Sequence, residues 1–230
     1  MNRILALLAF VSIVFTACNS NEIGNMKDVN PESIYFDYQV SGEEGNDFAT
    51  VMLQYRFAGP HGTTLVLEDP SRVELDGTQI KGDSSKMSGA FYEMQVPVPR
   101  LTGQHEIVFT DINKKQYKET FDFSPITFKA AIPTEINRGD LVFELNGLKN
   151  IDYVRVLLTD TSFHSEGINR VDTVKNGRVL ISRQDLELLV NGPIQLDLIR
   201  ENEKEVKNGT REGGMISVTY SLKREFVLKD

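Results

Sequence analysis

An alternation of apolar and polar side chains with a period of two runs through most of the chain from Ile34 onward. A period of two places the apolar side chains on one face of a β-strand, whereas an amphipathic helix needs a period of 3.6. We therefore expect an all-β chain whose strands each bury one face. The clearest apolar rows are Ile34, Phe36, Tyr38 and Val40; Val51, Leu53, Tyr55 and Phe57; Tyr92, Met94, Val96 and Val98; Val154, Val156 and Leu158; and Ile216, Val218, Tyr220, Leu222, Phe226 and Leu228.

Two dipeptides indicate tight turns between neighbouring strands. Asp76-Gly77 and Asn176-Gly177 each separate two short apolar runs. Such pairs tolerate the positive φ that both central residues of a type I′ turn adopt, so each predicts a two-residue hairpin. Pro97 and Pro99 follow the row that begins at Tyr92, and because proline has no N–H to donate, this strand is expected at a sheet edge.

One short helix is expected in the second half of the chain. Ser182 suits an N-cap, and Asp185, three residues later, completes a capping-box pattern. Gly192-Pro193 then ends the helix. The apolar stripe of this helix is Leu186, Leu189 and Val190.

The strand rows fall into two blocks that meet at Ser124-Pro125, residues 32–125 and residues 126–230. Each block is about 100 residues long, the usual size of one β-sandwich. The prediction is two tandem β-sandwiches with the one short helix in the second; a single larger sandwich or barrel is the alternative.

In size and strand rhythm, the two blocks resemble the immunoglobulin-like domains of bacterial surface lipoproteins. The resemblance implies immunoglobulin-like β-sandwiches. The Cys…Trp…Cys pattern of antibody domains cannot occur in this chain, because it has one cysteine and no tryptophan.

The N-terminus has the pattern of a secretory signal peptide. Met1-Asn2-Arg3 supplies one positive charge, residues 4–15 are apolar, and Thr16-Ala17 are small. The apolar run is shorter than the roughly 20 residues that span a membrane. We expect residues 1–17 to be removed; a plain secretory signal is the alternative to the lipid anchor considered next.

Phe15-Thr16-Ala17-Cys18 resembles the lipobox of bacterial lipoproteins, with Phe15 where leucine is usual. The resemblance implies cleavage between Ala17 and Cys18 and acylation of Cys18, including by palmitate. Asn19, rather than aspartate, after the cysteine implies the outer membrane, facing the periplasm or the cell surface. Residues 18–31 are polar and are expected to form a flexible tether to the membrane.

Charge and cysteine content exclude several classes of function. The net charge is -8, from 25 basic and 33 acidic side chains, which argues against a nucleic-acid partner. A single cysteine forms no intrachain disulfide and no Cys-based zinc site.

No catalytic pattern, metal-binding motif or cofactor motif is found. His61, His105 and His164 are far apart in sequence and match no metal-binding or catalytic spacing. We therefore expect a protein that is not an enzyme, with no catalytic residue, metal or cofactor.

The candidate ligand or partner surface consists of Tyr35 and Phe91, which have the outward parity of their strands. Exposed aromatic side chains suit protein contacts or sugar stacking; covering a domain junction is the alternative. Residues 200–211 are highly charged and are expected to form a solvated hairpin edge or a partner-binding arm.

Together these features predict a non-enzymatic, lipid-anchored cell-envelope protein that presents immunoglobulin-like domains for protein or glycan interaction. The alternatives are a carbohydrate-binding lipoprotein of a glycan-capture system and a hydrolase.

Overall fold

A computed structural model describes residues 22–162 and 165–230 of the chain. The predicted signal peptide, the cleavage site at Ala17 and Cys18, and His164 lie outside these residues. Within the described ranges, no helix has the length and apolar character needed to cross a membrane.

Short strands make up most of the first block. They are β1 (Ile23–Asn25), β2 (Ile34–Glu43), β3 (Phe48–Phe57), β4 (Thr63–Val66), β5 (Arg72–Leu75), β6 (Thr78–Gln79), β7 (Gly82–Ser85), β8 (Gly89–Pro97), β9 (Gly103–Thr110) and β10 (Gln116–Phe123). The helical elements are the 3₁₀ turns η1 (Met26–Asp28) and η2 (Pro31–Ser33) and the helix α2 (Val98–Leu101).

The second block continues with strands and one helix. They are β11 (Thr127–Phe128), β12 (Glu135–Asn137), β13 (Leu141–Asn146), β14 (Ile151–Thr159), β15 (Ile168–Lys175), β16 (Arg178–Ile181), α3 (Arg183–Leu186), β17 (Gly192–Glu205) and β18 (Gly214–Lys229).

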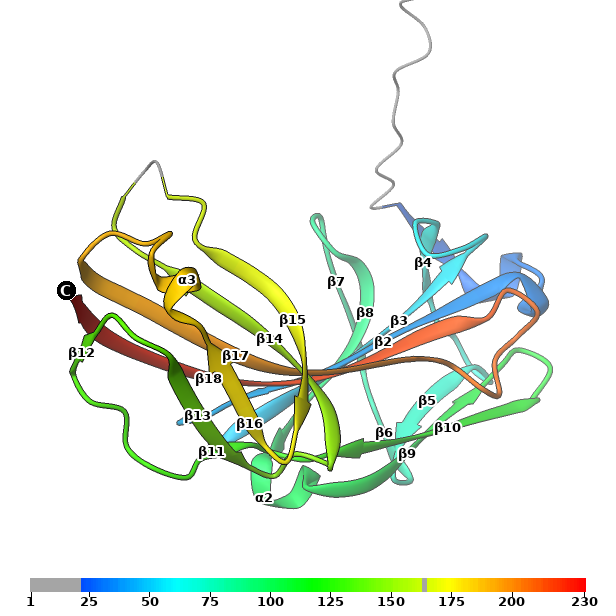
Figure 1. The fold of residues 1–230 in the computed structure, drawn as a ribbon. Coiled ribbons are helices and arrows are strands. Elements are labelled where there is room, and N and C mark those ends of the chain that lie inside the picture. Colours follow the sequence, from blue (N-terminus) through cyan, green and yellow to red (C-terminus); the bar gives the residue numbers. More distant parts are fainter. Residues whose placement is uncertain (1–21, 163–164) are drawn as a thin grey trace, which may run out of the picture.

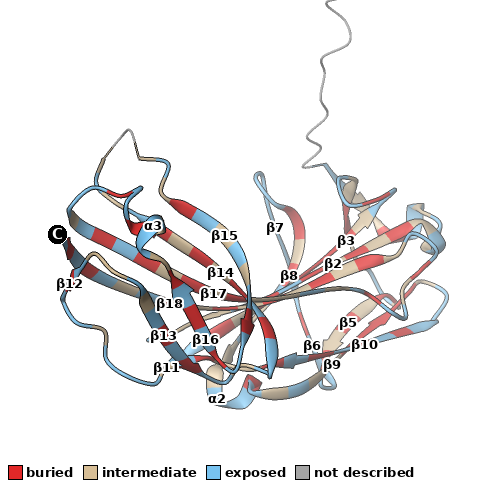
Figure 2. Cartoon of the chain, viewed as in Figure 1, coloured by how far each residue is buried: buried red, intermediate tan, exposed pale blue. Residues whose placement is uncertain are grey.

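The first block is a two-layer sandwich (Figure 1). One layer contains β4, β3 and β2, with β8 and β7 beyond β3, and the other has the order β10-β9-β5-β6. Aromatic rings from the two layers meet in the core: Phe109 stacks on Tyr55 at 4.4 Å between ring centroids, and Phe36 contacts both rings edge-on. Phe36 and Tyr55 come from rows that the alternation predicted to be buried, and such buried rows run along the strands in Figure 2.

The second block is also a sandwich, and one turn carries the chain between its layers. Asn176 and Gly177 have φ of 54° and 70°, as the predicted hairpin requires. However, β15 and β16 pair with each other only at Lys175 and Arg178. Along the rest of their lengths, β15 pairs with β14 and β16 pairs with β13. The expected turn is therefore present, but its strands separate into the two layers.

The long hairpin of β17 and β18 joins the two sandwiches. The two strands pair from Gly192 with Leu228 to Glu205 with Met215. The first half of β18, from Gly214 to Ser221, also pairs in parallel with β2 of the first block. One 14-stranded sheet therefore runs through both sandwiches (Figure 1). The predicted division at residues 125 and 126 stays a prediction, because β18 belongs to a layer of each sandwich.

The prediction of an all-β chain built from two sandwiches is confirmed, with a correction to the helices. The capping box of Ser182 and Asp185 forms as expected, but α3 ends at Leu186 and Val190 is exposed. The helix α2 was not predicted, because Val98 belongs to an apolar row. Pro99 lies in its first turn, where a missing N–H costs nothing.

The charged residues 200–211 form the outer part of the hairpin of β17 and β18, and the expected solvated edge is present in part. Residues 200–205 belong to β17: Arg200 is paired with both β14 and β18, whereas residues 201–205 pair with β18 alone, and Glu203 and Glu205 are exposed. The tip of the hairpin packs on the first block: the Lys204 ammonium and the Lys207 N–H both donate to the buried carboxylate of Glu119, at 2.8 and 2.9 Å. The Glu119 carboxylate of β10 therefore holds the tip of the hairpin against the first block.

The expected tether is folded in part. Ile23–Asn25 form β1, which pairs in parallel with β4, and Met26 is fully buried. Lys27 and Asn25 both donate to the carboxylate of Glu68. The apolar side chain of Met26 has a place in the core, so residues 23–31 belong to the folded body.

Candidate functional site

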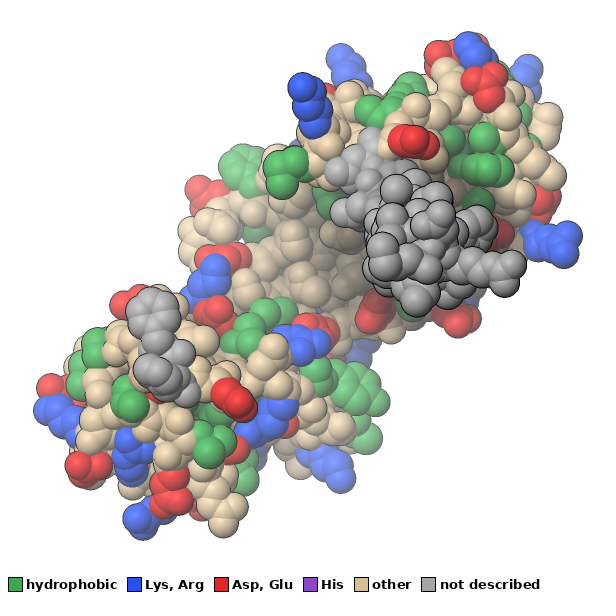
Figure 3. Space-filling view, turned by 90° about the horizontal axis from the view of Figure 1, so that it is seen from above, with side chains coloured by type: hydrophobic (Ala, Val, Ile, Leu, Met, Phe, Trp, Pro, Cys, Tyr) green, Lys and Arg blue, Asp and Glu red, His purple; other side chains and the backbone are tan. Residues whose placement is uncertain are grey.

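The shared sheet presents one continuous outward face across both sandwiches. Paired residues in a sheet point to the same side, and the pairs connect Ser217 to Gln39, Gln39 to Met52, and Met52 to Glu93. In the other direction, Arg155 pairs with Ile199, and Ile199 with Ser221. Figure 3 looks down on this face, which is recessed between two lobes. We refer to the outward side of β14, β17, β18, β2, β3 and β8 as the trough.

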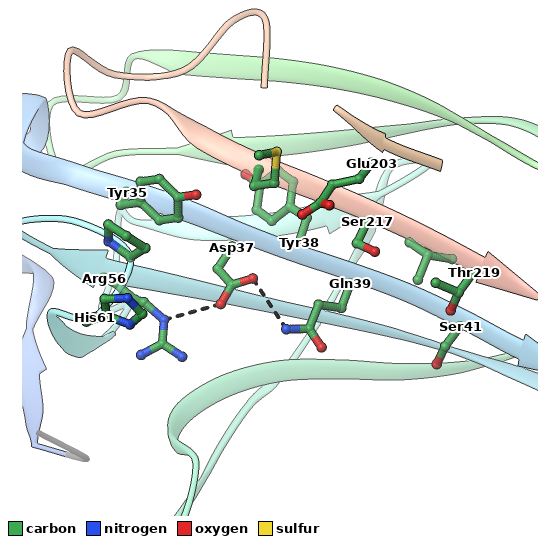
Figure 4. Close-up of a pocket in the computed structure, with 13 residues that line it drawn as sticks. Tyr35, Asp37, Tyr38, Gln39, Ser41, Arg56, His61, Glu203, Ser217 and Thr219 are labelled. Carbon is green, nitrogen blue, oxygen red and sulfur yellow. Dashed lines mark hydrogen bonds and ion pairs between the residues drawn. The ribbon is translucent and has the colours of Figure 1, made fainter. Parts of the chain in front are cut away.

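A hollow of about 590 Å³ lies in the trough over β2 and β18. Its polar lining comes from four places along the chain. These residues are Tyr35, Asp37, Gln39 and Ser41 of β2; Arg56 of β3 with His61 of the following loop; Glu203 of β17; and Ser217 and Thr219 of β18 (Figure 4).

One end of the hollow contains a connected group of planar polar side chains. The Arg56 Nε lies 3.3 Å from Asp37 Oδ2, and Arg56 Nη2 donates to Gln54 Oε1 at 2.6 Å. Gln39 donates to Asp37 Oδ1 at 3.4 Å (Figure 4). Asp37 and Arg56 neutralise each other, while each keeps hydrogen-bonding capacity for a ligand.

The phenol of Tyr35 is protonated at neutral pH. Burial, followed by the charges of Asp37, Glu203 and Glu205, raises the pKa of Tyr35 above its ordinary value of 10.0. Tyr35 therefore offers both an aromatic ring and a hydrogen-bond donor to the hollow.

The two aromatic residues predicted from parity lie on the same face of the sheet at different places. Tyr35 lines the hollow, opposite Arg56 of β3. Phe91 pairs with Asp83 of β7 on the far side of β3 and is not among the lining residues. The proposal that they form a ligand or partner surface therefore concentrates on Tyr35.

Sequence reasoning missed most of the hollow. Gln39 and Arg56 have the outward parity of their strands, which was a usable signal. Ser217 and Thr219 line the hollow because β18 pairs with β2, and no local sequence pattern predicts that pairing.

The described histidines occupy separate layers. His61 lines the hollow, whereas His105 belongs to β9 in the other layer, with its ring nitrogens 2.6 Å from Asp76 Oδ2 and 2.7 Å from the Leu101 carbonyl oxygen. Among the described residues, no group of three or more His, Cys, Asp or Glu is arranged to hold a metal ion.

A second hollow of about 310 Å³, lined mainly by apolar side chains, lies against β11, β12 and β13. Phe128, Ile132 and Phe143 contribute to its lining, and the Arg224 guanidinium lies 4.7 Å from the centroid of the Phe128 ring.

No protein-family model and no curated protein matches the sequence. Solved structures with partial likeness include the two immunoglobulin domains of DIP-gamma, with 10% identity, a TM-score of 0.24, and coverage of 85% of this chain and 95% of that one. The fibronectin(III)-like modules of Clostridium thermocellum CbhA have 9% identity and a TM-score of 0.23, with coverage of 82% of this chain and 92% of that one. Adhesin InvE of Yersinia pseudotuberculosis has 12% identity and a TM-score of 0.24, with coverage of 84% of this chain and 59% of that one. Likenesses this weak carry no argument about function.

Proposed function

We propose that the chain is a non-enzymatic, lipid-anchored protein of the cell envelope that binds a protein or glycan partner on the trough. The observation that carries this proposal is the hollowed, continuous outward face of the shared sheet. A sheet face that no other element of residues 22–162 and 165–230 covers, yet is concave and lined by convergent polar groups, has the form of a binding site.

The pairing of the charged groups in the hollow supports binding rather than catalysis. Its charged pair, Arg56 and Asp37, is mutually neutralised. A nucleophile with an adjacent base is the usual sign of covalent catalysis, and the contacts of the hollow contain no such pair.

The proposed anchor is Cys18, cleaved after Ala17 and acylated. Residues 19–22 lie between Cys18 and β1, and an extended chain spans at most about 3.6 Å per residue. The lipid would then hold the folded body within roughly 20 Å of the membrane, since β1 and Met26 are packed on the first sandwich. The proposed location is the outer membrane, on its periplasmic or its outer side.

Mass spectrometry of the mature N-terminal peptide tests the anchor. In a Gram-negative host, we expect a peptide that begins at Cys18 and carries a diacylglycerol group and an additional acyl chain. Cys18→Ala should lose labelled palmitate and leave the membrane fraction, whereas Asn19→Ala should keep its label. An unmodified N-terminus at Cys18, or at any other residue, would contradict lipid anchoring.

Affinity capture tests the binding function. The chain from residue 19 onward, immobilised through its C-terminus, should retain an envelope protein or glycan, and Tyr35→Ala should reduce the capture. Equal capture by wild type and Tyr35→Ala would show that the trough is not the binding surface.

A further inference from the structure

We propose that the hollow in the trough binds a neutral oligosaccharide. This inference rests on the proposed binding function and gives it a ligand class. It follows from the kinds of side chain that the hollow brings together and from their charge.

Uncharged hydrogen-bonding side chains form the floor of the hollow. The parallel register of β18 and β2 sets Ser217 beside Gln39 and Thr219 beside Ser41. Neighbouring strands lie about 4.8 Å apart, so the floor is a grid of hydroxyl and amide groups that both donate and accept. Sugar hydroxyls also donate and accept, which makes this grid complementary to them.

The pair of Arg56 and Asp37 adds planar groups at one end of the grid. Arg56 has five N–H donors, and its contacts with Asp37 and Gln54 engage Nε and Nη2. Asp37 accepts from Arg56 and Gln39 and keeps free lone pairs. A donor and an acceptor side by side suit two neighbouring hydroxyls of a sugar ring.

Tyr35 supplies the apolar contact that the grid lacks. It lies opposite Arg56 in the sheet, is half-buried, and borders the hollow (Figure 4). Aromatic rings pack against apolar surfaces while a polar tip stays hydrogen-bonded, and one face of a sugar ring carries mainly C–H groups.

The charge of the hollow selects against acidic ligands. Arg56 is already paired with Asp37, and Glu203 contributes a further negative charge to the lining. An anionic sugar would meet repulsion there rather than a free cation. The lining also includes the apolar side chains of Val40, Pro60 and Met215, so a protein partner is the alternative that the envelope capture tests.

Titration calorimetry with defined oligosaccharides tests the inference. The panel contains neutral hexasaccharides of glucose, mannose and xylose, with oligogalacturonate as the acidic member. We expect at least one neutral ligand to bind and oligogalacturonate to bind more weakly. Gln39→Ala should weaken binding by about threefold to tenfold, the value of one net hydrogen bond.

Matched aromatic variants locate the site. Tyr35→Ala should lose about tenfold or more in affinity, Tyr35→Phe should keep most of it, and Phe91→Ala should bind like wild type because Phe91 lies outside the hollow. Thermal unfolding of each variant shows that it remains folded. Equal losses in Tyr35→Ala and Phe91→Ala would overturn the assignment.

The outcomes separate this inference from the proposed function. If no neutral oligosaccharide binds, or if the acidic one binds as tightly, the inference fails. If a protein captured from the envelope then depends on Tyr35, the binding function of the trough stands without it. If nothing binds the trough in either experiment, the proposed function fails as well.

Discussion

Arg200 and Asp152 form an ion pair at the junction of the sandwiches, with side chains only 6% and 7% exposed. The Arg200 Nε lies 3.0 Å from Asp152 Oδ2 at an angle that makes no hydrogen bond, and Nη1 donates to the Ser124 carbonyl oxygen at 2.9 Å. One guanidinium therefore ties β17 to β14 and to the segment that links the two blocks.

Removing that guanidinium is expected to be costly. Arg200→Met would leave the Asp152 carboxylate buried without its cation, which costs about 3–5 kcal/mol in the free energy of unfolding. Arg155→Met is the matched control: Arg155 pairs with Glu201 on the same two strands, but the pair is about one-third exposed, so its loss should cost at most about 1 kcal/mol. Urea unfolding measures both.

Asp152→Asn added to Arg200→Met should recover part of the loss, because the unpaired charge is then gone. A cost for Arg200→Met below that of the Arg155→Met control would contradict this account of the junction.

At the scale of elements, α3 depends on one carboxylate. Asp185 accepts from the Ser182 N–H and hydroxyl and pairs with Arg170 at 2.7 Å. Burial raises the pKa of Asp185, but the hydrogen bonds from Arg170 and Ser182 outweigh it and hold the pKa below the ordinary 3.8. A lowered pKa in the folded state means that ionised Asp185 favours folding.

The stability that Asp185 contributes should therefore depend on pH. It is fully present above the unfolded pKa near 3.8 and is lost as the pH falls through the lower folded pKa. Asp185→Asn should cost about 1 kcal/mol or more at pH 7, and the difference from wild type should shrink below pH 3.8. Urea unfolding between pH 2 and pH 7 measures it; a difference independent of pH would rule out the charged interaction.

The burial of each strand could be predicted from the sequence, whereas the pairing of distant strands could not. Rows such as Ile34 to Val40 are local, and each strand buries one face regardless of its neighbours, so burial was predictable. The turn at Asn176-Gly177 was predictable for the same reason. The separation of β15 from β16 was not, because β16 pairs with β13, about 35 residues away along the chain, and local residues do not encode that choice.

The hollow was predictable to the same limited degree. The parity of Tyr35 placed it on the outward face, which was correct. Its neighbours Ser217 and Thr219 come from the other end of the chain through the parallel pairing of β18 with β2. Long-range pairing of this kind depends on the whole core rather than on any short pattern.

At the scale of the molecule, the hairpin of β17 and β18 is the feature that unites the two blocks. β18 gives its first half to the sheet of the first sandwich and its second half to the second, where it also pairs with β12. The tip of the hairpin is held by Glu119 and the junction by Arg200. We infer that the sandwiches unfold together, and that this single body keeps the trough in one shape for its ligand.

Calorimetric unfolding of the chain from residue 19 onward tests this central claim most directly. One body of about 200 residues should unfold in a single transition near 60 °C with an enthalpy of about 140 kcal/mol, and the van't Hoff enthalpy should equal it. Two transitions, or a van't Hoff enthalpy near half the calorimetric value, would show that the sandwiches unfold independently and would contradict the account.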